Sequence, residues 1–290
     1  MEFSMQQIDV NNWAEFKSNI DFIRNKYGYH EYDLEDNQKY KIKNTVLFRG
    51  QSCAEWTLQT TLERKSKFAF SVIQYVHKST RVVHELESFT GNQWDLSDFP
   101  DLVKEIKQDR VFGFHIPMSL YKYWIYLRHH GYPSPLLDWS ESPYIAAYFA
   151  MCDSQKNDSN NDHRAAIFAY IDRLGHGKSF DGGPIIQVRG PFVSTHKRHF
   201  IQQAWYTTST RWLSDYEPCV FCSHHDVFEK PNQNDEQDLL IKITIPITER
   251  KTVLKELLDY NINHFTLFQT EDALAKALSI KEFDISDIFS

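Results

Sequence analysis

The sequence predicts a single compact α/β (α+β) domain over residues 1–290, with a small mixed or antiparallel sheet flanked by helices. Segments with helical spacing of apolar residues are interspersed with several short strand-like runs, which is typical of this class. No stretch rich in Pro, Gly or Ser divides the 290 residues, so we expect one domain with insertions. Hydrophobic residues make up 41% of the chain, which is enough for one large core.

Residues 1–44 are expected to form an N-terminal helix followed by a loop. Apolar residues recur at roughly helical spacing within residues 8–23, and Asn11 or Asn12 is suited to cap that helix. The stretch 31–43 is polar, and we expect it to be a loop.

Residues 45–212 form the part of the chain that contains the motifs. Residues 45–48 are β-branched and aromatic, which predicts a buried strand that ends in a turn at Gly50. A mostly helical insertion is expected at about 65–126. The Ser-Pro pair at 142–143 predicts the start of a buried helix, because Ser is a good cap and Pro at the first position loses no hydrogen bond.

Residues 239–290 are expected to form a closing strand–helix unit. Isoleucines alternate with other residues over 241–247 and predict a half-buried strand. Residues 265–268 are a further candidate strand. A final helix is expected around 273–278, with Thr270 as its cap.

The charge and the distribution of apolar residues exclude several classes of protein. A net charge of −7 disfavours a uniformly basic nucleic-acid binder, although a local basic groove is compatible with it. The first residues contain no basic segment followed by an apolar core, and no run reaches the roughly 18 apolar residues of a membrane span. Four cysteines are too few for a disulfide scaffold in a chain of this length. We therefore expect a cytoplasmic protein without a membrane partner.

The pattern that comes nearest to a metal site is Cys219 and Cys222, followed by His224 and His225. A structural zinc site normally needs a second ligand pair at a defined spacing, and the other two cysteines are isolated. Two packed thiols are the favoured interpretation, so no metal is predicted. The glycine-rich phosphate loop, GxGxxG, HExxH and GxSxG signatures are also absent.

The first candidate for a functional residue is Arg49, which directly follows the strand predicted at 45–48. Arginine offers a rigid fork of donors suited to phosphate or carboxylate. Gly50 next to it allows the backbone to turn or a ligand to approach closely. The alternative is a structural arginine that is satisfied by carbonyl groups or by an acid.

The second candidate is the segment 127–143, a loop that leads to a predicted helix N-terminus. It contains His129, His130, Asp138, Trp139 and Ser142. Free backbone amides and the helix dipole suit such an end to an anion. The alternative assigns Asp138 and Ser142 to capping and Trp139 to the core.

Three segments, taken in order, resemble the FRG domain, a family named for its Phe/Tyr-Arg-Gly motif. They are LFRGQ at 47–51, HGYP and LLDWS within 130–140, and the segment 198–207 with its Gln-Gln pair. The resemblance covers most of the chain. The sequence departs from the family at 134–135, which is Ser-Pro instead of Thr and a basic residue, and at Ala204, where the family has Gly.

FRG-domain proteins are mostly bacterial or phage proteins of poorly defined activity, often found in defence or toxin–antitoxin contexts. The resemblance therefore implies an effector of this type, with a neutralising antitoxin protein as a partner. It implies a family more firmly than a reaction.

The order of the motifs is also similar to that of ADP-ribosyltransferases, in which a strand-borne Arg and a Ser before a helix hold NAD. This similarity implies that Arg49 clamps the pyrophosphate and that Ser142 supports the nicotinamide side, with Tyr148 or Trp139 stacked on a ring. The implied NAD-binding residues are Arg49, Gln51, His130, Trp139, Ser142 and Tyr148. The catalytic group stays open between Glu271, Asp138 and Gln202, with Glu141 as a further acid.

Three functional hypotheses follow. The first is an NAD-dependent, ADP-ribosyltransferase-like effector that modifies RNA, DNA or protein. The second is a nucleic-acid-binding or nuclease-like effector with a basic pocket of Arg49, Arg128, His129, His130, Lys197 and Arg198. The third is a non-enzymatic nucleotide sensor or interaction module that uses the same pocket.

Overall fold

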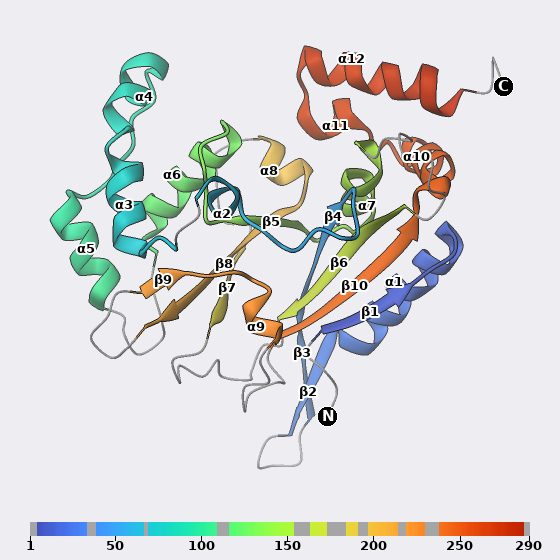
Figure 1. Ribbon diagram of the computed structural model, residues 1–290, viewed down its shortest axis with the longest axis horizontal. Coiled ribbons are helices and arrows are strands. Elements are labelled where there is room, and N and C mark those ends of the chain that lie inside the picture. Colours follow the sequence, from blue (N-terminus) through green and yellow to red (C-terminus); the bar gives the residue numbers. More distant parts are fainter. Residues whose placement is uncertain are drawn as a thin grey trace.

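An eight-stranded mixed sheet runs through the molecule in the order β1-β10-β6-β4-β5-β8-β7, with β9 paired to β8 (Figure 1). The structure is a computed structural model and describes residues 5–33, 39–66, 69–108, 116–153, 163–172, 184–190, 197–213, 219–229 and 238–286. The strands are β1 (Met5–Asp9), β4 (Thr45–Gln51), β5 (Leu137–Ser140), β6 (Arg164–Asp172), β7 (Ile185–Arg189), β8 (Ala204–Trp212), β9 (Cys219–Phe221) and β10 (Asp238–Pro246). β1 and β10 are parallel and the other pairs are antiparallel. The predicted α/β class with a mixed sheet is confirmed.

A separate two-stranded ribbon, β2 (Tyr29–Asp33) with β3 (Lys39–Lys43), lies where a loop was expected. The loop prediction for 31–43 is therefore wrong over these strands. The side chains of Tyr29 and Tyr40 are 60% and 50% exposed. Strands that do not bury one face lack the alternation of apolar and polar residues by which a strand is predicted.

Helices α1 (Trp13–Tyr27), α7 (Pro143–Cys152) and α10 (Arg250–Asp259) pack with β4, β6 and β10 into the largest hydrophobic cluster. Two predicted caps are confirmed here. The Asn12 side chain accepts a hydrogen bond from the amide of Glu15 at 2.9 Å, and the Ser142 hydroxyl accepts one from the amide of Ile145 at 3.3 Å. Almost every residue of α7 is buried, as the predicted apolar circumference requires.

Gly50 lies inside β4, which continues to Gln51, so the predicted turn at this residue is wrong. A Cβ atom at this position would lie 1.9 Å from the Ala146 carbonyl oxygen and 2.7 Å from the Ala150 amide nitrogen. Both atoms belong to the backbone of α7. The glycine therefore allows α7 to pack directly on the strand that contains Arg49.

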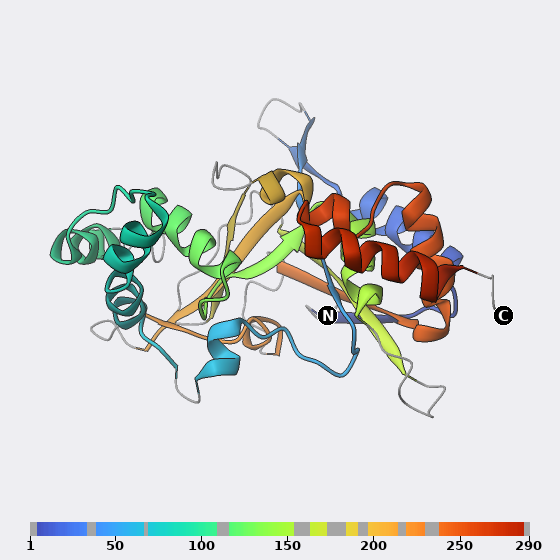
Figure 2. The same cartoon turned by 90° about the horizontal axis from the view of Figure 1, so that it is seen from above.

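The described part of residues 65–126, where a helical insertion was expected, is mostly helical. It comprises α3 (Val72–Thr80), α4 (Val83–Thr90), α5 (Phe99–Gln108) and most of α6 (Met118–His129), and α2 (Thr61–Lys65) precedes it. These helices pack with β8 and β9 in a second hydrophobic cluster. Figure 2 shows them gathered at the opposite end of the molecule from the C-terminal helices.

The other face of β4 and β6 is covered by a third, smaller cluster. Leu47 of β4 packs there with Trp139 of β5, Tyr170 of β6 and Phe228 of α9 (Asp226–Glu229). Because side chains alternate along a strand, Arg49 emerges on the same face of β4 as Leu47, opposite to α7.

The C-terminal part contains η1 (Ile247–Glu249), α10, α11 (His264–Phe268), α12 (Glu271–Ser279) and the π-helical turn η2 (Ile280–Ile285). The short helix α8 (Lys197–Ile201) contacts α11. Within the described residues, no helix combines the length and the apolar character that a membrane crossing needs.

The predicted strand at 265–268 is wrong, because these residues form α11. The Asn263 side chain accepts a hydrogen bond from the Thr266 amide at 3.1 Å, and the Thr266 hydroxyl accepts one from the Asn263 amide at 3.0 Å. Periodicity alone cannot separate a short helix from a strand, and here the reciprocal cap favours the helix. Thr270 caps α12, as predicted.

Replacing Gly50 with Ala is expected to destabilise the protein by about 3 kcal/mol, at the upper end of the cost of overpacking a core. The added methyl group would have to displace the backbone of α7. Gly91→Ala is the matched control, because Gly91 has a φ of +71° and nothing within 4 Å of an added Cβ. It should cost only about 1 kcal/mol, from backbone strain. Urea unfolding measures both costs, and a Gly50→Ala cost no larger than that of Gly91→Ala would contradict the packing.

Candidate functional site

A cavity of about 880 Å³ opens where β4, β5, α2, α6, α8 and α11 meet. Four arginines contribute to its lining, together with three carboxylates. They are Arg49, Arg64, Arg128 and Arg198, with Glu55, Asp138 and Asp153. We call this site the arginine cavity. Its volume lies within the range of sites that bind small molecules and cofactors.

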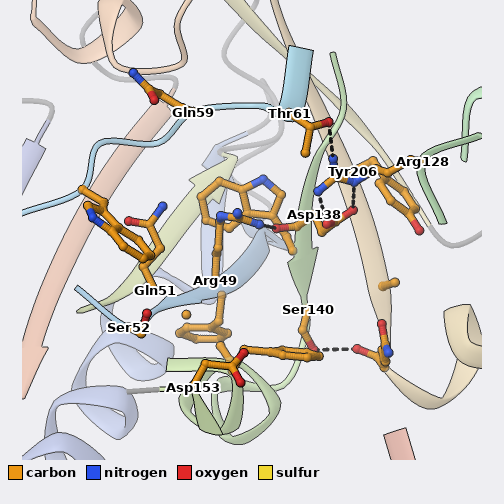
Figure 3. Close-up of a pocket in the computed structure, with 18 of the residues that line it drawn as sticks. Arg49, Gln51, Ser52, Gln59, Thr61, Arg128, Asp138, Ser140, Asp153 and Tyr206 are labelled. Atoms are coloured by element: carbon orange, nitrogen blue, oxygen red, sulfur yellow. Dashed lines mark hydrogen bonds and ion pairs between the residues drawn. The ribbon is translucent and has the colours of Figure 1, made fainter. Parts of the chain in front are cut away.

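Arg49 reaches from β4 toward the backbone of β5 (Figure 3). Its Nη1 donates a hydrogen bond to the carbonyl oxygen of Asp138 at 2.8 Å. Its Nε is buried and has no hydrogen-bond partner within the described part of the chain. Burial is the main cause that lowers the pKa of Arg49 to about 10, and the charges of Arg128 and Arg64 add to it while Asp138 opposes it. The guanidinium is still protonated near neutral pH.

Asp138 is held by Arg128 through both carboxylate oxygens. Arg128 Nε donates to Oδ1 and Nη2 donates to Oδ2, which is the bidentate geometry of a strong arginine–carboxylate pair. Burial raises the pKa of Asp138, but the charge and hydrogen bonds of Arg128 outweigh it and hold the pKa below its usual value. Asp138 is therefore an ionised anchor. Two guanidinium groups act on this one carboxylate, Arg128 through hydrogen bonds and Arg49 through its charge alone.

A buried chain of hydrogen bonds joins Trp139, Thr207 and His224 near the cavity. Trp139 Nε1 donates to the hydroxyl of Thr207 at 2.7 Å, and the same hydroxyl lies 2.8 Å from His224 Nε2. Burial, assisted by the charge of Arg49, lowers the pKa of His224 to about 3, so this imidazole is neutral at physiological pH. Trp139 is 3% exposed and belongs to the third cluster, although it also borders the cavity.

Two predicted glutamines line the cavity, and each is engaged by backbone groups. Gln51 Nε2 donates to the carbonyl of Thr57 at 3.3 Å, across the loop that follows β4. Gln202 Nε2 donates to the carbonyl of Leu267 at 3.0 Å, and the Gln202 carbonyl accepts from the hydroxyl of Ser140 at 2.7 Å. Both residues therefore support the walls of the cavity.

Four other predicted residues do not line the cavity. His130 is exposed at the end of α6, against the ring of Tyr126. Ser142 caps α7 and borders a different cavity, between α7 and α11. Tyr148 is 2% exposed in the main core, and Glu271 is exposed in the first turn of α12. The predicted residues that the fold brings together are Arg49, Gln51, Asp138, Trp139 and Gln202.

Several cavity residues were not predicted from the sequence. Glu55 and Trp56 lie on the loop after β4, and Asp153 lies at the end of α7. Phe268 contributes an aromatic wall from α11, with the Arg198 guanidinium 5.3 Å from its ring centroid. Of these residues, only the Glu55–Trp56 pair offers a signal in the sequence, because it closely follows the FRG motif in a polar segment.

In the cysteine and histidine pattern at 219–225, Cys219 is buried and Cys222 is partly buried. The Cys222 thiol lies 3.2 Å from the hydroxyl of Ser209, and burial raises the pKa of Cys219 to about 12 and that of Cys222 to about 11. Protonated, packed thiols of this kind are poor metal ligands. The described residues contain no group of three or more His, Cys, Asp or Glu side chains that could hold a metal ion.

Asp138→Asn is expected to cost about 2 kcal/mol of stability at pH 7, because it leaves Arg128 without its ion-pair partner and removes a negative charge that acts on Arg49. The cost should fall below that of a fully buried pair, since the Asp138 side chain is 43% exposed. Because folding lowers the pKa of Asp138, the pair stabilises above the unfolded value of about 3.9 and is lost as the pH falls through the folded value.

Urea unfolding between pH 7 and pH 3 measures this effect. The difference between wild type and Asp138→Asn should shrink below about pH 4, and the exposed Asp259→Asn control should show little difference at any pH. A difference that stays constant down to pH 3 would contradict the assignment.

Residues 44–159 match the model of the FRG domain. The matched region includes Arg49, the loop after β4, and the Arg128–Asp138 pair, whereas Arg198 and Phe268 lie beyond it. Comparison with curated proteins and with solved structures gives no match. The chain therefore contains an FRG domain, over residues 44–159, and that domain supplies the charged centre of the arginine cavity.

Proposed function

We propose that the arginine cavity binds a phosphate-bearing nucleotide, and that the chain uses NAD as an ADP-ribosyltransferase-like enzyme acting on a macromolecule. The observation that supports this most directly is the charge at the centre of the cavity. Arg128 occupies both oxygens of the Asp138 carboxylate, and Arg49 acts on this carboxylate through its charge alone. The only hydrogen-bond partner of Arg49 within the described residues is a neutral carbonyl group.

A buried charge without a counter-ion is costly, so an anion in the cavity would stabilise this arrangement. A phosphate can accept two parallel hydrogen bonds from an arginine guanidinium, in the same bidentate geometry as a carboxylate. Arg64 adds a third guanidinium that acts electrostatically on Arg49. A ligand with two linked phosphates, such as a dinucleotide, matches this set of charges better than a single carboxylate does.

Aromatic side chains also line the arginine cavity. Trp56 is 58% exposed although it lines the cavity, and Phe149 and Phe268 lie with their ring centroids 6.0 Å apart. Aromatic faces of this kind stack on nucleobases or on nicotinamide. A cluster of arginines with aromatic walls and a volume of about 880 Å³ supports a nucleotide more than a simple inorganic anion.

The proposed reaction is supported by carboxylates in the cavity, whereas the proposed biological role is supported only by the family. Transfer of ADP-ribose breaks the bond between nicotinamide and ribose, and a carboxylate stabilises the positive charge that develops on the sugar. The cavity offers such groups in Glu55 and Asp153. A role as a bacterial or phage defence or toxin effector, with an antitoxin as partner, rests on the family alone.

Arg49→Ala is expected to weaken binding of NAD and of ADP by about 10- to 100-fold, the loss of one to two charge-assisted hydrogen bonds. Arg49→Lys should recover only part of the affinity, because an ammonium group lacks the planar fork. Calorimetric titration of the purified chain with NAD, ADP and adenosine measures this. Adenosine should bind far more weakly than ADP if the phosphates provide the affinity.

Arg211→Ala is the matched control, because Arg211 is exposed on β8 and does not line the cavity. It should bind NAD as wild type does. The enzymatic part is tested by nicotinamide release from NAD in the presence of cell lysate, where wild type should exceed Arg49→Ala by at least about tenfold. Equal release by the two proteins would contradict the proposal.

The same experiments separate the two alternative functions. Four of the six basic residues of the nucleic-acid hypothesis line the cavity, namely Arg49, Arg128, His129 and Arg198. Salt-dependent RNA binding that NAD does not compete with would favour that hypothesis. Thermal stabilisation by nucleotide without nicotinamide release would favour a sensor.

A further inference from the structure

The loop at residues 52–57 is held firmly beneath the two side chains at its tip. The Ala54 amide donates to the carbonyl of Arg164 at 2.8 Å, which ties the loop to β6. Gln51 Nε2 donates to the Thr57 carbonyl and closes the base of the loop. Ala54 is buried, whereas Glu55 and Trp56 are exposed and line the cavity. The fold thus presents an acid and an indole at a fixed place on the wall of the cavity that Arg49 also lines.

The carboxylates of the cavity differ in what they already bind. Asp138 has both oxygens on Arg128. Asp153 is paired with Lys276 of α12 at 2.6 Å. Within the described part of the chain, Glu55 has no ion pair and no hydrogen bond to its carboxylate. It is the cavity carboxylate that can receive a proton or face a developing positive charge without giving up another partner.

Trp56 occupies the neighbouring position of the loop. Its side chain is 58% exposed and lines the cavity, so the face of the indole is accessible to a ligand. Stacking on Trp56 would place a flat ring of the ligand against the loop that also contains Glu55. The phosphates would then extend toward the arginines on β4, α2 and α6.

We propose that Glu55 is the catalytic carboxylate of this site and that Trp56 stacks on the nicotinamide ring of NAD. The inference rests on the proposed use of NAD. The bond between the nicotinamide nitrogen and ribose C1′ breaks, and its electron pair leaves with neutral nicotinamide. A bond forms between C1′ and an oxygen or nitrogen atom of the acceptor. The Glu55 carboxylate stabilises the charge on the sugar and accepts the proton that the acceptor loses.

Glu55→Gln tests this assignment because it keeps the size and polarity of an exposed side chain. Nicotinamide release should fall by about 100-fold or more, as expected for loss of a general base. The Kd for NAD, measured by calorimetry, should stay within about threefold, because the arginines provide the phosphate contacts. Glu85→Gln, at an exposed position of α4, is the control and should match wild type in both measurements.

Trp56→Ala should weaken NAD binding by about tenfold, the expected loss of one stacking contact. Trp56→Phe should recover most of the affinity, since it keeps an aromatic face. Equal affinity of Trp56→Ala and wild type would overturn the stacking assignment.

The outcomes separate this inference from the proposed function. If wild type and Glu55→Gln release nicotinamide at the same rate, only the assignment of Glu55 is wrong. If Glu271→Gln loses turnover while Glu55→Gln does not, the catalytic carboxylate is on α12. A tenfold or greater loss of NAD affinity in Glu55→Gln would make this residue a binding group instead. If wild type releases no nicotinamide at all, the proposed function fails and the role of Glu55 fails with it.

Discussion

Asp138 is the point on which the cavity and the attachment of the helical insertion both depend. Its carboxylate binds Arg128 at the end of α6, and its backbone carbonyl binds Arg49 on β4. One residue of the short strand β5 thereby joins the end of α6, ten residues before it, to β4, 89 residues before it. The helical insertion and the central sheet are fixed relative to one another at the same place where the positive charge of the cavity is concentrated. Removing that carboxylate would disturb the fold and the site together.

The sequence predicted the features that local chemistry determines. The caps at Asn12, Ser142 and Thr270 were recognisable because a short polar side chain precedes an apolar helical pattern. The mixed sheet and the helical insertion followed from periodicity. Arg49 could be selected because an arginine directly after a predicted buried strand must be satisfied by carbonyl groups, by an acid or by a ligand.

The failures have a common physical origin in distant contacts. Gly50 signals a turn locally, but its real constraint is the backbone of α7, about a hundred residues further along the chain. Ser142 was expected beside Arg49, whereas α7 meets the cavity through Ala146 and Phe149 in its middle. Glu55 was overlooked, since its only signal in the sequence is that it closely follows the FRG motif in a polar segment. The fold adds that this loop lines the same cavity as Arg49.

The position of Phe268 near the C-terminal end of the sequence affects the order in which the walls of the cavity can fold. α11 lies outside the FRG match, and Gln202 and Arg198 bind the backbone carbonyls of Leu267 and Phe268 to close that side of the cavity. Ribosomal synthesis produces Arg49 long before it produces these residues. A growing chain can therefore fold the strand with its arginine while the cavity is still open on one side. The complete arginine cavity arises only after the C-terminal helices have been made and have docked.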